Sequence, residues 1–191
     1  MMGCMDSRAA LDQSLAELAR LLPSVRSDAW PRPTPCPAWS VADVFDHVLT
    51  ITDKFTRFAA GWTDAPRGRV VHPLDRCAAL VTAISQSRAA WSEVDLRRVC
   101  RLPFGDFPAQ EAAAINAADV LVHTWDIARG AGLDYSIPDD LVPGALATIR
   151  SLTSGEAIGA GHYGLPPAAA DSGGTHAVLL ASGRSPAWPD E

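Results

Sequence analysis

The stretch from Asn116 to Asp126 constrains this chain more than any other, because a polar stripe crosses an otherwise apolar helical segment there. Asp119 and His123 are four residues apart, so an α-helix places both side chains on one face, one turn from each other. Asn116 and Asp126 extend that face. A helix that is apolar over most of its circumference is usually buried, and a buried carboxylate or imidazole is costly unless it is paired, hydrogen-bonded or coordinated. The stripe therefore predicts a metal site, an internal polar network, a subunit interface or a solvent-facing edge.

The remainder of the chain is mostly helical in pattern. Apolar residues at helical spacing predict further helices over 6–22, 40–58, 74–94 and 138–152, and the striped helix begins near Pro108 and ends at Gly130 and Gly132. Ser40 and Asp43 have the spacing of a capping box, with Asp in place of the usual Glu. Residues 97–107 allow a short extended segment, and 153–174 are irregular. The simplest packing is an all-α, antiparallel four-helix bundle with additional short helices and loops.

The length and the net charge of the chain limit the number of domains and the kinds of partner that can be expected. At 191 residues the chain fits one domain, 1–191, with a core over about 6–155 and an irregular C-terminal extension, 156–191, packed on it. A net charge of −6 argues against nucleic acid or an anionic membrane as partner. No apolar run reaches the roughly 18 residues of a membrane span, and the N-terminus lacks a signal-peptide pattern, so we expect a cytoplasmic protein. The oligomeric state is open, with a homodimer as one candidate.

The four cysteines are widely scattered and form no C-x-x-C pair, which indicates free thiols rather than a zinc ribbon or a disulfide framework. A reactive role for Cys36 is a minor alternative. The chain also lacks a Gly-rich phosphate loop, a G-x-S-x-G elbow and an H-E-x-x-H helix, which argues against nucleotide hydrolysis, serine esterase chemistry and zincin proteolysis. Any chemistry is therefore expected to depend on the polar stripe.

A metal held by Asp119 and His123 needs a further ligand from another helix, and His47 is the best candidate because it lies two turns into the second predicted helix. Three protein ligands leave a coordination position open for water or substrate, whereas closed structural zinc sites use four. Asn116 and Asp126 are expected to hydrogen-bond to the ligands without contacting the metal themselves. Zinc is the expected metal, although two histidines and a carboxylate also suit nickel or iron.

Two segments resemble the signatures of a known family, the mycothiol-dependent maleylpyruvate isomerase N-terminal domain family. The first is Thr34–Val44 followed by His47 and Val48, and the second is Ala118–Arg129; Pro138–Asp140 and Gly183–Pro186 resemble later landmarks. The resemblance implies a DinB-like four-helix bundle that holds a divalent metal, often zinc, through a His of the second helix and an acid and a His on a later helix. Position by position, it implies His47, Asp119 and His123.

The resemblance also implies mycothiol as a co-substrate, although this chain has Asp119 where the isomerase has Glu and lacks an obvious separate C-terminal domain. Three interpretations stay open. The leading one is a metal-dependent enzyme that uses a low-molecular-weight thiol to isomerise, conjugate or transfer a group on a small electrophilic substrate. The second is a non-catalytic module that binds metal or a small molecule, and the third has no metal.

Other polar residues have weaker predictions. Arg129 either pairs with Asp126 or binds an anionic substrate, with a surface ion pair the safer interpretation. His72 is expected to be a surface residue. His162 and His176 lie in or near irregular segments and are expected to face solvent, with the alternative that either lines a pocket; His162 is favoured for that role because the long loop could fold over the bundle. Trp39 and Trp125 are expected to be packing anchors rather than substrate platforms.

Overall fold

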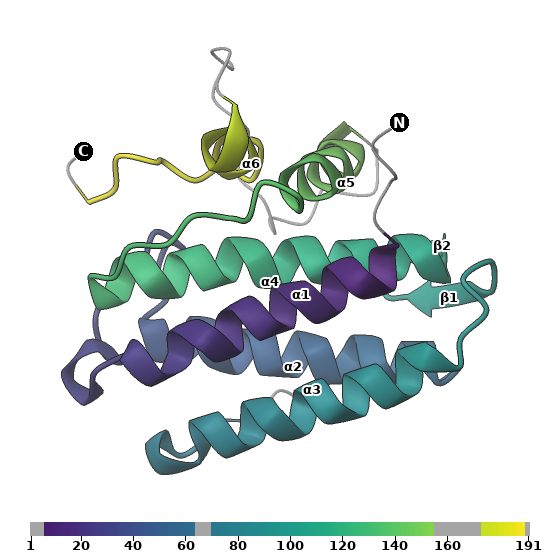
Figure 1. The fold of residues 1–191 in the computed structure, drawn as a ribbon, viewed down its shortest axis with the longest axis horizontal. Coiled ribbons are helices and arrows are strands. Elements are labelled where there is room, and N and C mark those ends of the chain that lie inside the picture. Colours follow the sequence, from purple (N-terminus) through teal and green to yellow (C-terminus); the bar gives the residue numbers. More distant parts are fainter. Residues whose placement is uncertain (1–5, 64–69, 155–172, 190–191) are drawn as a thin grey trace.

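The computed structural model describes residues 6–63, 70–154 and 173–189. Its helices, coloured along the chain in Figure 1, are α1 (Ser7–Leu21), α2 (Val41–Ala59), α3 (Arg76–Ser92), α4 (Ala109–Ala131), α5 (Val142–Ser154) and α6 (Gly174–Ala181). The segment left undecided by the sequence is an antiparallel hairpin of β1 (Val99–Leu102) and β2 (Gly105–Pro108) that leads into α4. The predicted all-α bundle is confirmed, with this small hairpin added.

Helix α4 lies between two apolar cores. On one side α1, α2 and α3 pack with it around Phe45 and Leu80, and on the other Leu121 of α4 packs with Ile149 of α5 and Val178 of α6. Figure 1 shows α5 and α6 on the side of the bundle opposite to α2 and α3. Because α4 is covered from both sides, the polar stripe is not the solvent-facing edge that one interpretation allowed.

The start of α2 is fixed by the predicted capping box. The Asp43 amide donates to Ser40 Oγ at 3.3 Å, and the Ser40 amide donates to Asp43 Oδ2 at 2.9 Å, so two donors at the helix N-terminus are satisfied reciprocally. The preceding loop is closed by Val41 N donating to Arg32 O at 3.0 Å and Thr34 N donating to Trp39 O at 3.1 Å. These bonds fix the positions from which Trp39 and the first turns of α2 extend.

The end of α4 differs from the prediction. Gly132 is its left-handed C-cap, with φ of 72°, but Gly130 lies inside the helix and does not close it. A Cβ at Gly130 would lie 2.7 Å from Val41 Cγ2 and 2.8 Å from the Pro33 carbonyl oxygen. Gly130 therefore serves the close approach of α4 to the loop before α2, because no side chain fits between them.

The C-terminal part is more ordered than an irregular extension, since residues 174–181 form α6 and residues 182–189 then run back along α4. Residues 155–172, including His162, lie outside the described residues. Among the helices that are described, none combines the length and the apolar character that crossing a membrane requires. Cys36, Cys77 and Cys100 are free thiols, as predicted.

Candidate metal centre

Three predicted ligands converge between α2 and α4. Asp119 Oδ1 lies 3.7 Å from His47 Nε2 and 3.6 Å from His123 Nε2, and the three ligand atoms all lie within 4.8 Å of one another. Two ligands of one tetrahedral zinc ion, each about 2.0–2.1 Å from it, are separated by roughly 3.3–3.4 Å. The two distances to Asp119 Oδ1 exceed this separation by only a few tenths of an ångström, so each histidine lies close to the position in which it and Asp119 can share an ion.

His123 is oriented by a buried carboxylate. Its Nδ1 lies 2.9 Å from Asp126 Oδ2, and Arg184 Nη2 donates to the same oxygen at 3.0 Å. Because Asp126 Oδ2 accepts from the Arg184 guanidinium, this oxygen acts as an acceptor toward His123 as well, which assigns the proton to the imidazole Nδ1 and leaves the lone pair of Nε2 toward Asp119. A ligating histidine that donates its other N–H to a carboxylate is the usual arrangement around protein-bound metals.

Asp119 carries an oxygen without a partner. Burial alone would raise the pKa of its carboxyl, but the neighbouring His123 and His47 hold that pKa below its ordinary value, so the group is ionised at neutral pH. Its Oδ2 atom is buried and accepts no hydrogen bond from the described residues. An unsatisfied buried carboxylate oxygen is costly, and a cation beside it would remove that cost.

The loop before α2 forms a wall beside the histidines. The Trp39 ring centroid lies 4.7 Å from that of His47 and 6.0 Å from that of His123, so the predicted packing anchor also borders the candidate ligands. Cys36 Sγ lies within 4.8 Å of a His123 nitrogen and an Asp126 oxygen, in a second set of ligand-type atoms. Asp126 is already engaged by Arg184 and His123, and burial raises the pKa of the Cys36 thiol, so the first set suits a metal better.

Asn116 and Arg129, which were also predicted to support the site, lie in different surroundings. Asn116 is fully buried one turn before Asp119, but neither of its amide atoms has a hydrogen-bond partner in the part of the chain that the structure describes. Arg129 does not pair with Asp126, because Arg184 occupies that carboxylate; Arg129 Nη2 instead donates to the Trp188 carbonyl at 2.6 Å. The pairing predicted for Arg129 is thus wrong, since its side chain lies on another face of α4.

Two histidines outside the centre are exposed, as predicted. The Nδ1 atom of His72 accepts a hydrogen bond from the backbone of Leu74, and His176 lies on α6, away from the three candidate ligands. The sequence analysis missed Arg184 as a partner of Asp126. Arg184 lies in the Gly183–Pro186 segment that resembles the family, but nothing in the sequence indicated which acidic residue it contacts.

The fold and the site define a DinB-like helical bundle with a candidate divalent-metal centre. The profile of the mycothiol maleylpyruvate isomerase N-terminal domain matches residues 11–128, which is more than half of the chain, and the protein belongs to that family. The matched range includes His47, Asp119 and His123 and stops before Arg184.

The chain is also similar to two curated proteins in sequence and to two solved structures in fold. Two proteins from strains of Mycobacterium tuberculosis, named uncharacterized proteins Rv0738 and MT0763, are each 29% identical over 162 residues, which cover 82% of this chain and 85% of theirs. A crystal structure of mycothiol-dependent maleylpyruvate isomerase matches with a TM-score of 0.59 at 16% identity, and a histidine-to-alanine mutant of it with 0.60 at 14%. Both matches cover 78% of this chain and 70% of the solved one, and they establish the fold alone.

Proposed function

We propose that this protein binds one divalent metal ion through His47, Asp119 and His123, with zinc expected first and nickel or iron as alternatives. We further propose that it is an enzyme that works with a low-molecular-weight thiol of the mycothiol kind. The reaction class is isomerisation, conjugation or group transfer on a small electrophilic substrate. The thiol and the reaction class rest on the family and on the similarity to mycothiol-dependent maleylpyruvate isomerase.

The observation that carries the proposal is the convergence of two imidazole nitrogens on one oxygen of Asp119 while its other oxygen stays unpartnered. A buried hydrogen-bonded network would satisfy both oxygens, whereas a metal site needs ligand lone pairs that are not already used. Three protein ligands also leave room for a further group on the ion, which suits catalysis better than a closed structural site.

Each residue has a distinct role in this proposal. A bound divalent ion acts as a Lewis acid that stabilises negative charge on a thiol sulfur. Asp126 keeps the His123 ring in the tautomer that presents Nε2, and Arg184 holds the Asp126 carboxylate in place by hydrogen bonding to the same oxygen. Trp39 covers one side of both histidines and limits access by water. Because burial keeps the Cys36 thiol protonated, the reacting thiol is expected to come from outside the chain.

Metal content per chain tests the first part directly. Inductively coupled plasma mass spectrometry on untagged protein should give close to one ion for the wild type and little for His47→Ala, Asp119→Ala and His123→Ala. His72→Ala is the matched control, because it removes an exposed histidine that is not one of the three candidate ligands and should keep the metal. A wild type that stays empty after reconstitution with zinc, nickel and iron would refute the metal site.

Turnover tests the second part. The metal-loaded wild type, incubated with mycothiol and a panel of small electrophiles, should show thiol-dependent turnover that His47→Ala and His123→Ala lose and His72→Ala keeps. Stoichiometric metal without turnover would favour the alternative, a non-catalytic module that binds metal or a small molecule. Turnover that is indifferent to both histidine changes would exclude the proposed centre as its source.

A further inference from the structure

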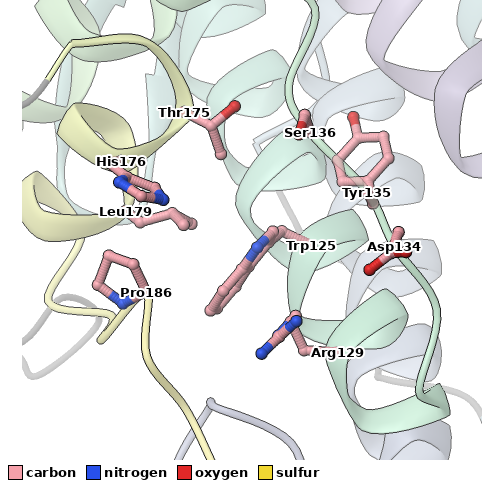
Figure 2. Close-up of a pocket in the computed structure, with 9 residues that line it drawn as sticks. All are labelled: Trp125, Arg129, Asp134, Tyr135, Ser136, Thr175, His176, Leu179 and Pro186. Atoms are coloured by element: carbon pink, nitrogen blue, oxygen red, sulfur yellow. The ribbon is translucent and has the colours of Figure 1, made fainter.

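A second polar cavity lies on another face of α4, between that helix, the connection before α5, and α6 with the segment after it (Figure 2). Its volume is about 280 Å³, and none of the three candidate metal ligands lines it. The exposed lining is mostly polar: Arg129 and Asp134 supply opposite charges, and Trp125, Leu179 and Pro186 supply the smaller apolar part. A cavity of this volume accommodates a small organic molecule rather than a macromolecular segment.

The two charged groups are not neutralised by each other. Arg129 uses Nη2 for the Trp188 carbonyl, its Nε has no partner within the described ranges, and no ion pair joins it to Asp134. A guanidinium has five N–H donors, so donors are left for a ligand. The Asp134 carboxylate, which also lines the cavity, is exposed, and Figure 2 shows it next to Tyr135.

The other polar side chains of the cavity are less suited to fix a ligand. Thr175 Oγ1 already accepts from the Ile137 amide at 2.9 Å. His176 and Ser136 are exposed and can add a hydrogen bond without deciding the charge of the ligand. The recognition elements are therefore one cation, one anion and an aromatic wall.

We propose that this cavity binds a small zwitterion of the α-amino-acid class with a short apolar side chain. The ligand carboxylate meets Arg129, its ammonium group meets Asp134, and its apolar part lies against Trp125, Leu179 and Pro186. A carboxylate paired with a guanidinium forms a charge-assisted hydrogen bond, and the second pair gives the site its preference for molecules that carry both charges. The proposal does not depend on the metal centre.

Three probes that differ by one charged group test it. Isothermal titration calorimetry with leucine, 4-methylvalerate, which lacks the ammonium group, and isopentylamine, which lacks the carboxylate, should give the tightest binding for leucine. Asp134→Asn should weaken leucine about tenfold or more but leave 4-methylvalerate unchanged, because only leucine uses that carboxylate. Asp139→Asn, an equal charge change at an exposed residue of the same connection outside the cavity, should leave both unchanged.

Arg129→Gln should weaken leucine and 4-methylvalerate together by about tenfold or more. Since Arg129 also contacts the Trp188 carbonyl, circular dichroism and the melting temperature of that variant must match the wild type for the result to count, and Asp134→Asn keeps the test valid if they do not. Equal affinity for leucine and 4-methylvalerate would overturn the zwitterion, and no binding of leucine at millimolar concentration would overturn the site. Binding should persist after treatment with EDTA, which separates this result from the fate of the metal centre.

Discussion

The two polar faces of α4 differ in whether their charged side chains are paired with one another. At the first face, His123, Asp126 and Arg184 are almost fully buried and bonded to one another in a row that ends at the candidate ligands beside α2. Toward α6, Arg129 and Asp134 lie around an open cavity without pairing. Buried charges must be paired to be tolerated, whereas charges at a cavity mouth are solvated until a ligand binds. This difference supports the proposal of one small cation in a fixed geometry at the first face, and of a ligand that carries its own charges at the second.

Arg184→Met gives the largest expected difference between the faces. It leaves the fully buried Asp126 carboxylate without its cation, and breaking one side of a buried pair costs about 3–5 kcal/mol. Arg129→Met leaves no buried carboxylate alone and should cost well below that. Urea unfolding followed by circular dichroism gives both free energies. Equal losses in the two variants would mean that the faces do not differ in this way.

Metal removal should affect one face only. Zinc at about 100 times its dissociation constant is expected to raise the free energy of unfolding by about 2.7 kcal/mol, because it binds the folded chain at His47, Asp119 and His123. EDTA should reverse that gain and leave the affinity for leucine unchanged. Thermal unfolding with and without zinc provides the measurement. A gain that persists in His47→Ala would place the stabilising ion somewhere else.

Alanine substitutions at two glycines are expected to change the free energy of unfolding in opposite directions, because the space around the two glycines differs. Gly130→Ala on the metal side forces a Cβ to within 3 Å of Val41 and Pro33, and overpacking of this kind costs about 1–3 kcal/mol. Gly144→Ala in α5 meets nothing within 4 Å and should stabilise by about 0.4–1 kcal/mol. The two free energies of unfolding should therefore change in opposite directions. Gly130→Ala at no cost would show that α4 and the loop before α2 can separate easily.

Ser40→Ala is expected to cost about 1 kcal/mol, from loss of the cap on α2. Hydrogen bonds from Ser40 lower the pKa of Asp43, so the stability that Asp43 contributes is present above its unfolded pKa of about 3.9 and is lost as pH falls through the lower folded value. The difference between wild type and Ser40→Ala should therefore shrink below about pH 4. Urea unfolding at neutral pH and at successively lower pH measures it, and a difference that stays constant would argue against the Asp43 bond.

Local signals predicted the features that depend on neighbours in sequence. The capping box at Ser40 and Asp43 was readable because its partners are three residues apart, and the placement of Asp119 beside His123 followed from helical spacing. The placement of His47 beside Asp119 could not be predicted from local spacing, because it depends on how α2 packs on α4. The periodicity of the second helix and the family resemblance were sufficient for that step.

Long-range partners were not predictable in the same way. Arg129 was the obvious partner for Asp126 because it lies one turn away, yet the pair is made by Arg184. The path of the segment after α6 determines which arginine meets Asp126. Residues 174–181, which form α6, were predicted only as part of an irregular extension. The cavity lined by Arg129 and Asp134 depends on the same path, so the sequence alone could not indicate it.

The position of Arg184 has a consequence for how the protein matures during translation. The arginine follows Asp126 by 58 residues, so at ordinary rates of synthesis the ribosome makes it about 3–12 seconds after the candidate ligands are complete. During that interval α4 has its histidine and both acids, but Asp126 lacks its cation. The hydrogen-bonded row that orients His123 is therefore completed only after the segment that follows α6 has been made.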